Sequence, residues 1–566
     1  MAPGILYVTM QPKPELPFEQ FEDWYNNEHG PLRLRLSFCE NGFRYRATDL
    51  DGPGKGQHEW MAIYDLDDMD KLNGDEYLKL RGPPVQTQRE VDIRPYLDIN
   101  RRNFDLLSDR KTDDYQPVER IGGEDAGNVM VHVAFTVKPD QDPEEIGRWY
   151  DEEHTAMLQK VPGWRRTRRF KTSSIEKSQV TEYLALHEYA PKNGLAGPEF
   201  VAATTTPWAH KVNNEVIASK HRRVYSHYYT FGPAPRHLSS ITNWSSPATL
   251  TRTLSTTPSI LESYITTPDG ARINYHLTGS SSPTAPVVLC LPSILSHHSI
   301  YSSFTSHLLS KHPHLRVLRY NTRGRTSSLG TTTPITLQTL TSDALSLLDA
   351  LRIPSVALAI GVSLGGVTVL NLGLKHPSRV PVFLACDTNA KAPPSNPKAW
   401  GERIAMAEAD ASAASTTTGA YGGPSEDAFV ATVEKGDKVV GEELAEATVR
   451  RWFVKESYDG GELEARVKEV KEMVRSNSLE GFKGSVRALY EYDITAELEG
   501  CKARGEFLVG AGDGVLPEGM KKMAAQLGDG KGGKGVKCTV VEGAGHLPMV
   551  ERPEEVAQAV IKMLES

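Results

Sequence analysis

The segment Val356-Ala-Leu-Ala-Ile360, followed by Gly361-Val362-Ser363-Leu364-Gly365-Gly366, decides the fold of the C-terminal half. Its apolar first part predicts a buried strand, and residues 367–375 predict a helix. In this context the G-x-S-x-G spacing is typical of a strained strand-to-helix turn that exposes a serine nucleophile. Side chains at the flanking glycines would clash in such a turn. The Leu364 N–H is then expected at a helix N-terminus, where it can stabilise an oxyanion.

Two later segments supply the partners that such a serine needs. Asp513 follows the apolar run 507–509, and His546 follows the run 538–541. Both are therefore expected on loops at the carboxyl ends of strands, where open α/β sheets place their active sites. The chain order predicts a triad in which His546 takes the proton of Ser363 and Asp513 holds the imidazole tautomer. The alternative interpretation is a capping serine in a tight glycine turn.

The surrounding pattern predicts a mostly parallel sheet with an inserted cap. Strand-like runs at 286–291 and 315–319 alternate with a helical pattern whose apolar face includes Leu340, Leu347 and Leu351. Between about 392 and 485 the pattern becomes helical and charged, which is typical of a cap inserted between strands.

Further motifs in this half carry a family resemblance. They are Cys386-Asp387-Thr388-Asn389-Ala390-Lys391, Trp400 with Arg403 and Ile404, Arg451-Trp452-Phe453, and Gly481-Phe482-Lys483-Gly484. With the serine turn, they make residues from about 260 to 566 similar to the α/β-hydrolase superfamily and, within it, to 3-oxoadipate enol-lactonases. The resemblance implies a Ser-His-Asp hydrolase with a helical cap over its pocket. That family opens a cyclic enol ester that carries a carboxylate.

Two loops depart from the pattern of these relatives. Pro292-Ser293-Ile294-Leu295 stands where relatives have His-Gly or Asn-Ser-Leu-Gly, and the backbone amide of Ile294 is the expected second oxyanion donor. Asn321-Thr-Arg-Gly-Arg325 stands where relatives have D-x-R-G-H. Three nearby side chains can be interpreted either as pocket-lining or as structural: His297, His298 and Arg323.

The N-terminal half contains an internal repeat. Trp24-Tyr25-Asn26-Asn27-Glu28-His29 recurs 125 residues later as Trp149-Tyr150-Asp151-Glu152-Glu153-His154. Around each copy the pattern predicts β-α-β-β-α-β, a ferredoxin-like unit, over residues 1–115 and 116–235. Each such unit leaves one sheet face exposed. Two units are therefore expected to pack sheet to sheet and close an α+β barrel with a pocket inside.

The first copy continues as Gly30-Pro31-Leu32 and the second as Thr155-Ala156-Met157. With the preceding motif, residues 1–235 resemble the EthD-like branch of the dimeric α/β-barrel superfamily. The resemblance implies decarboxylase, dehydratase, cyclase or oxygenase chemistry on aromatic or polyketide compounds. His29 and His154 are candidates for a second, acid–base site. The alternative is that each imidazole bonds to neighbouring backbone and fixes the end of its helix.

Composition narrows the classes of partner. The chain has 566 residues, of which 39% are hydrophobic and 24% charged, and a net charge of −8, which argues against a nucleic-acid partner. Five dispersed cysteines indicate neither a metal site nor a disulfide framework. No run is long and apolar enough for a membrane span, so a cytoplasmic location is expected. No cofactor is expected. The Ser/Thr/Pro-rich segment 236–258 predicts a linker before a hydrolase domain at 259–566.

The sequence thus predicts an α/β-hydrolase fold fused to a tandem ferredoxin-like barrel. The expected activity is a lactonase or esterase acting on a small aromatic or polyketide-derived metabolite, with the barrel carrying a second step. Three alternatives stay open for the assignment of roles. The hydrolase could cleave C–C bonds, the barrel could be the main catalyst, or the barrel could be a non-catalytic module for binding or dimerisation. A homodimer is a further expectation.

Overall fold

The computed structural model describes residues 2–83, 85–118, 124–177, 180–238, 259–413, 436–458 and 460–566. Packing contacts divide them into two compact units, one of residues 2–235 and one of residues 236–238 and 259–566. The segment expected as a linker lies outside the described residues apart from 236–238. No helix in the described ranges combines the length and the apolar character that a bilayer crossing requires.

The first unit is a closed, eight-stranded antiparallel barrel. Its strands are β1 (Gly4–Pro12), β2 (Cys39–Ala47), β3 (Trp60–Leu66), β4 (Leu97–Lys111), β5 (Val129–Val137), β6 (Trp164–Thr172), β7 (Tyr183–Tyr189) and β8 (Ile217–Thr230). Both halves have the same internal strand order, β4-β1-β3-β2 and β8-β5-β7-β6. The halves join where β2 pairs with β8 and β4 pairs with β6, so every barrel strand has two neighbours.

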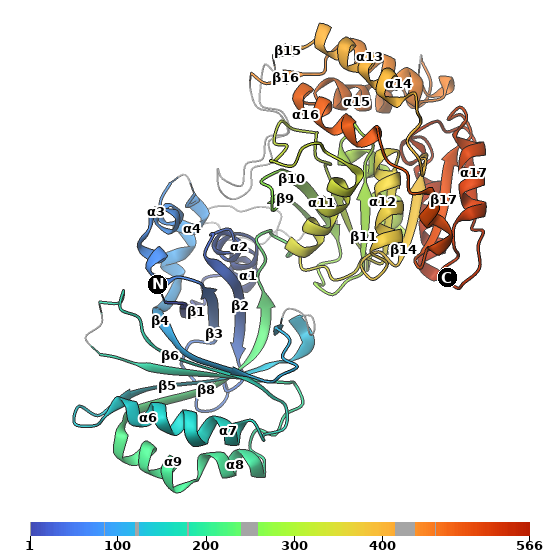
Figure 1. The fold of residues 1–566 in the computed structure, drawn as a ribbon. Coiled ribbons are helices and arrows are strands. Elements are labelled where there is room, and N and C mark those ends of the chain that lie inside the picture. Colours follow the sequence, from blue (N-terminus) through green and yellow to red (C-terminus); the bar gives the residue numbers. More distant parts are fainter. Residues whose placement is uncertain are drawn as a thin grey trace. The chain divides into compact units, whose positions relative to one another are not determined.

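Helices cover the outside of this barrel, as Figure 1 shows. They are α1 (Phe18–Trp24), α2 (Gly30–Leu34), α3 (Asp75–Leu78) and α4 (Gln88–Ile93) in the first half, and α6 (Pro143–Trp149), α7 (Thr155–Leu158), α8 (Pro198–Thr204) and α9 (Pro207–Lys211) in the second. A π-helical turn separates α1 from α2 at Tyr25–His29, and another separates α6 from α7 at Tyr150–His154. Each repeated motif therefore lies in one helix whose middle turn is widened.

Barrel residues alternate between two cores because successive side chains of a strand point to opposite faces. In β1, Ile5 and Tyr7 belong to the cluster inside the barrel, whereas Leu6 and Val8 pack beneath the helices. We expected the pocket inside the barrel. Apolar side chains fill most of that interior, and a cavity of about 240 Å³ opens at one end of it. A larger cavity of about 590 Å³ lies between the strands and helices of the second half.

The second unit contains an eight-stranded, mostly parallel sheet in the order β18-β17-β14-β13-β11-β12-β10-β9. These strands are β9 (Ser259–Thr266), β10 (Arg272–Gly279), β11 (Val287–Leu291), β12 (Arg316–Tyr320), β13 (Leu358–Val362), β14 (Val382–Cys386), β17 (Arg504–Gly510) and β18 (Cys538–Val541). In this sheet β10 is reversed, since it pairs antiparallel with both β9 and β12, and the other pairs are parallel. The central strand β13 is completely buried, which agrees with its continuous apolar sequence.

Helices flank this sheet and form a cap over one of its ends (Figure 1). The flanking helices are α10 (Ser302–Lys311), α11 (Leu337–Ala350), α12 (Leu364–Lys375), α17 (Leu516–Gln526), α18 (Pro548–Glu551) and α19 (Pro553–Glu565). The cap contains α13 (Asn396–Ala409), α14 (Glu442–Trp452), α15 (Glu464–Arg475), α16 (Leu479–Ser485) and the short pair β15 (Ser412–Ala413) and β16 (Lys438–Val439). The charged helical pattern of this region is therefore an insertion between β14 and β17.

Candidate active site

Ser363 lies on a strained turn between β13 and α12. Its backbone has φ 58° and ψ −117°, a conformation that L-residues rarely adopt. The flanking glycines permit the turn because a Cβ at Gly365 would lie 2.6 Å from the Pro292 carbonyl oxygen. A Cβ at Gly361 would meet the backbone of Gly365. The turn therefore requires glycine on both sides of the serine.

The end of β14 holds this turn in place. The Ser363 N–H donates to the Cys386 carbonyl at 3.0 Å, and Thr388 Oγ1 donates to the Ser363 carbonyl at 2.8 Å. The Ser363 backbone is thus bonded on both sides, while its side chain makes no hydrogen bond to another described residue. The serine hydroxyl is left available for chemistry.

His546 and Asp513 form a close pair on the loops that follow β18 and β17. His546 Nδ1 lies 2.6 Å from Asp513 Oδ2, and the two side chains are 13% and 15% exposed. The backbone N–H of His546 donates to the backbone carbonyl of Trp452 at 2.7 Å, and the imidazole and indole rings stack with centroids 5.9 Å apart. The cap helix α14, which ends at Trp452, therefore helps to fix the imidazole. With Nδ1 bonded to the carboxylate, Nε2 is the nitrogen left to exchange protons.

A second carboxyl group, on Asp387, lies beside this pair. Asp387 follows β14 and has φ 43°, and its Oδ1 accepts the Gly510 N–H at 2.9 Å. Its side chain is buried, and Oδ2 has no hydrogen-bond partner among the described residues. Burial and the neighbouring Asp513 raise the pKa of Asp387 well above its usual value. Sequence reasoning noticed Asp387 only as part of a motif, because its approach to Asp513 depends on two strands far apart in the chain.

Among the described residues, Asp387, Asp513 and His546 are the group whose oxygen and nitrogen atoms approach closely enough to hold a metal ion, all within 4.8 Å. Two of these atoms are already engaged, since Asp387 Oδ1 accepts from Gly510 and His546 Nδ1 contacts Asp513. The absence of a metal stays a prediction.

The two expected oxyanion donors are backbone amides near the serine turn. Leu364 is the first residue of α12, and its N–H makes no hydrogen bond within the described part of the chain. Ile294 lies in the loop after β11, next to Leu295, which has φ 63°. The start of this loop contacts the turn, because the carbonyls of Leu291 and Pro292 face Gly365.

The cap contributes two arginines around one indole ring. The guanidinium carbon of Arg403 lies 4.6 Å from the ring centroid of Trp400, and that of Arg451 lies 5.8 Å from it. Burial and the neighbouring Arg403 lower the pKa of Arg451 to about 10, so it stays cationic at neutral pH. Arg451 has no ion pair with any described residue. This part of the cap can therefore accept an anion.

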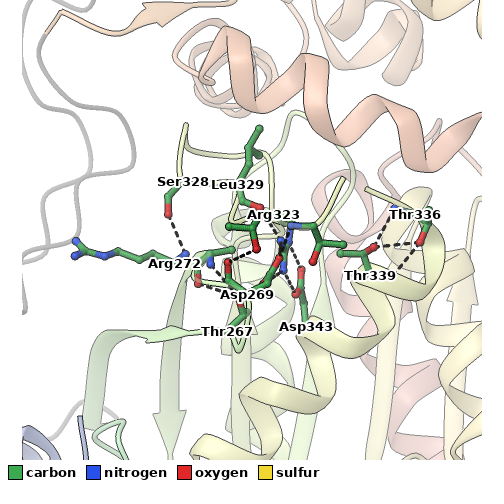
Figure 2. A network of polar contacts seen from close by, with 12 residues as sticks. Thr267, Asp269, Arg272, Arg323, Ser328, Leu329, Thr336, Thr339 and Asp343 are labelled. Carbon is green, nitrogen blue, oxygen red and sulfur yellow. Dashed lines mark hydrogen bonds and ion pairs between the residues drawn. The ribbon is translucent and has the colours of Figure 1, made fainter. Parts of the chain in front are cut away.

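Arg323 is structural, which resolves one of the alternatives left open by the sequence. Figure 2 shows its guanidinium between Asp269 and Asp343, with a further bond to the carbonyl of Leu329. Its five N–H donors are all used, at 2.5 to 2.9 Å. No donor remains for a substrate. The residue fastens the loop after β12 to the β9–β10 turn and to α11.

The neighbouring histidines also support the loops. The backbone N–H of His298 donates to Asn321 Oδ1 at 2.9 Å, and its ring lies 3.9 Å from that of His297. His297 Nδ1 lies 2.9 Å from Ser299 Oγ. Burial lowers the pKa of both imidazoles well below the usual value. These contacts fit the structural alternative better than a pocket-lining role.

The repeated histidines of the barrel differ in their partners. His29 Nδ1 lies 3.1 Å from a carboxylate oxygen of Glu90, whereas His154 Nδ1 donates to the Ala203 carbonyl at 2.9 Å. Burial would raise the pKa of Glu90, but His29 and Arg33 together lower it to about 2. Burial lowers the pKa of His154 to about 4, so that ring is neutral at physiological pH. The pairing of His29 with Glu90 could not be read from the repeat, because no carboxylate occupies the matching place in the second copy.

The glutamates of the motif join helices within each half. Glu28 accepts from Thr87 Oγ1, and Glu153 accepts from Thr206 Oγ1 at 2.6 Å. Thr87 and Thr206 are the N-caps of α4 and α9. Neither glutamate contacts the adjacent histidine of its own motif, which agrees with their separation of about 100° around a helix.

Comparisons with known proteins concern the C-terminal half. The model of the Alpha/beta hydrolase family matches residues 288–559, so this region is an α/β-hydrolase. Among solved structures, a hydrolase from Pseudomonas aeruginosa PA01 is 26% identical, covering 54% of this chain and 98% of its own, with a TM-score of 0.43. An enol-lactonase from Burkholderia xenovorans LB400 is 24% identical, covering 54% and 100%, with a TM-score of 0.42.

An esterase from Thermogutta terrifontis is 22% identical, covering 54% of this chain and 98% of its own, with a TM-score of 0.42. No curated protein matches the sequence. The family match supports a hydrolase enzyme and leaves the N-terminal barrel without an assigned family.

Proposed function

We propose that residues 259–566 form a serine hydrolase of the lactonase or esterase type. Ser363 is the nucleophile, His546 the general base, and Asp513 the residue that holds the imidazole. The observation that carries the proposal is the 2.6 Å contact between His546 and Asp513 in a unit whose serine lies on a strained, glycine-flanked turn. These three side chains come from the ends of β13, β17 and β18, as an open α/β sheet requires.

The reaction has two halves. His546 Nε2 takes the proton of Ser363 while the hydroxyl oxygen attacks the substrate carbonyl, and the amides of Leu364 and Ile294 donate to the oxyanion. The C–O bond to the leaving group then breaks, and His546 returns the proton to the departing oxygen. Water repeats the sequence on the acyl-enzyme, releasing the acid and restoring Ser363.

The cationic residues of the cap favour a substrate that carries a carboxylate. Arg451 and Arg403 form a cationic pair beside Trp400. Burial and Arg403 lower the pKa of Arg451, and Asp513 partly offsets this change. A carboxylate on a small ester or enol-lactone would offset one of these two positive charges. The substrate class we propose is therefore a small, carboxylate-bearing ester or enol-lactone of aromatic or polyketide origin. C–C bond hydrolysis by the same serine is the alternative.

The test is turnover of a panel of enol-lactones, aryl esters and 1,3-diketones by the wild type and by Ser363→Ala. Hydrolysis should fall to the residual level that binding and an oxyanion hole alone supply, about 10³–10⁴ over water. Ser306→Ala is the matched control, because Ser306 is an exposed serine on α10. Wild-type turnover by Ser363→Ala would refute the proposed nucleophile, and preferential turnover of the diketones would favour C–C cleavage.

For the first unit we propose a tandem ferredoxin-like barrel of the EthD-like kind. The shared strand order of the two halves and the repeated helix support this assignment. Its role is either a second step on the same metabolite or ligand binding. His154 is the better candidate for chemistry because it lines the larger cavity, whereas His29 is paired with Glu90 beside a cavity of about 110 Å³. We also propose that the protein works in the cytoplasm without a cofactor.

A further inference from the structure

The larger cavity of the barrel unit, about 590 Å³, has the size of a small-molecule site. It lies between the strands and helices of the second half. Its walls are largely aromatic and aliphatic, formed by Phe135, Trp149, Tyr150, Tyr189 and Phe200 among others. Such walls favour a flat, apolar ligand body over a hydrated one.

The charge at the rim of this cavity is positive. Lys220 and Arg222 of β8 both line it, and none of the described residues around it is acidic. Lys220 Nζ donates to Asn213 Oδ1 at 2.7 Å, and the Arg222 guanidinium carbon lies 5.7 Å from the Phe200 ring centroid. Within the described ranges neither cation forms an ion pair, so their charge is available to a ligand anion.

Two residues that line the cavity carry polar atoms without a partner among the described residues. Tyr189 is 1% exposed, and its hydroxyl makes no hydrogen bond to any described residue. His154 uses Nδ1 to donate to Ala203, which leaves Nε2 as an acceptor in the neutral ring. A buried hydroxyl without a partner is costly, and a ligand oxygen would satisfy it. The widened π-helical turn that ends at His154 adds a feature that is frequent at functional sites.

The matching cavity in the first half is smaller and contains an acid. It measures only about 110 Å³, and Glu90 lines it while pairing with His29. Glu90 is the third residue after the helix cap Thr87, and Ala209 is the third residue after the corresponding cap Thr206. The second half therefore has a methyl group where the first has a carboxylate, and it keeps its histidine and its cations free of an internal acid.

We propose that the cavity of the second half binds a flat, largely apolar organic anion. The aromatic walls hold the body of the ligand, Arg222 and Lys220 attract its anionic group, and the Tyr189 hydroxyl donates to one of its oxygens. This binding does not depend on the hydrolase activity proposed for the second unit.

The experiment uses the full chain and two fluorescent probes that differ in one group. 8-Anilino-1-naphthalenesulfonate carries a sulfonate, and N-phenyl-1-naphthylamine is the neutral molecule without it. The wild type should bind the anionic probe. Lys220→Gln/Arg222→Gln should weaken that binding at least about fivefold at low ionic strength, because rim cations act through screened attraction, while binding of the neutral probe changes less than about twofold. Lys55→Gln/Lys79→Gln removes two exposed lysines of the first half and should leave both affinities unchanged.

Unchanged affinity of Lys220→Gln/Arg222→Gln for the anionic probe would overturn the proposal. An equal loss of affinity for both probes, with an unaltered circular dichroism spectrum, would also overturn it. Should the double variant misfold, the near-isosteric Tyr189→Phe decides. This substitution removes only the unpartnered hydroxyl. It should weaken binding of the anionic probe and leave binding of the neutral probe unchanged. Wild-type affinity of Tyr189→Phe for the anionic probe would then refute the site.

Discussion

His546 Nδ1 lies 2.6 Å from Asp513 Oδ2, and a second carboxyl group, on Asp387, lies close to both. Two acids near one imidazole raise the question of which of them holds it. Asp513 contacts the imidazole directly, whereas burial and the neighbouring Asp513 raise the pKa of Asp387. We therefore propose that Asp513 holds the imidazole and that Asp387, bonded to the Gly510 amide, supports the loop.

We predict that Asp513→Asn lowers kcat by about 10³–10⁴-fold with little change in stability. The amide keeps the shape of the carboxylate but no longer stabilises the imidazolium or selects the correct tautomer. The measurement is steady-state hydrolysis of the best ester or lactone in the panel, with thermal unfolding as the check on the fold. A loss of kcat of less than about tenfold would mean that another residue orients the imidazole.

Asp387→Asn should retain most of the activity, in contrast to Asp513→Asn. The introduced amide can still accept the Gly510 N–H through its oxygen and donate through its NH₂, as a protonated carboxyl does. Asp387→Ala should instead destabilise the protein by about 1–3 kcal/mol, because it leaves the buried Gly510 amide unsatisfied. Denaturant unfolding and turnover of both variants test this. A reversed order, with Asp387→Asn inactive and Asp513→Asn active, would make Asp387 the residue that holds the imidazole.

Arg451→Gln should raise KM for carboxylate-bearing substrates and leave KM for neutral esters nearly unchanged. The expected increase is about tenfold, the typical effect of one charge-assisted hydrogen bond. Arg450→Gln is a matched control on the same helix, where Arg450 pairs with Glu446 at 2.7 Å. Equal effects of Arg451→Gln on both substrate types would exclude carboxylate recognition by the cap.

Residues 259–566 expressed alone should stay soluble and hydrolytically active, because all the residues of the proposed reaction lie within them. Residues 1–115 alone should aggregate or form a homodimer. They would lose the pairing of β2 with β8 and of β4 with β6, and would expose the apolar face that forms the barrel interior. Size-exclusion chromatography with light scattering distinguishes these states. A stable, monomeric first repeat would contradict this prediction.

The sequence was informative where one short motif dictates its own geometry. The glycines around Ser363 can serve only a tight turn, and the order of Asp513 and His546 follows from the strands that precede them. Strand limits were less well predicted. Residues 356–360 were expected as the strand, but Val356 bonds to the Arg379 carbonyl, and β13 begins at Leu358.

Contacts between distant segments that belong to no recognised motif could not be predicted. The pairing of His29 with Glu90 joins residues 61 positions apart, and the support of Asp387 by Gly510 spans 123. Neither pair has a periodic or spacing signal, because both depend on how separate elements pack. The π-helical turns of the repeat could not be predicted either. An apolar pattern sampled over two turns does not distinguish a regular helix from a locally widened one.

Glu28→Gln should stabilise the barrel unit at neutral pH and above, and much less near pH 4.5. Burial raises the pKa of Glu28 from 4.5 to about 7, so the folded chain favours the protonated carboxyl. The stability of the wild type relative to Glu28→Gln is therefore greatest below pH 4.5, and it falls as the pH rises through about 7. A shift of this size corresponds to a difference of about 3 kcal/mol. The measurement is the thermal unfolding of both proteins between pH 4.5 and 8.

Glu153→Gln is the matched control in the second copy of the motif. Glu153 accepts from Thr206 as Glu28 does from Thr87, but it is partly exposed, so its replacement should change the pH dependence of unfolding much less. The Glu28→Gln substitution keeps an oxygen that can accept from Thr87, so loss of that hydrogen bond does not explain the result. A pH-independent difference between the wild type and Glu28→Gln would show that Glu28 ionises in the folded chain as readily as in the unfolded one.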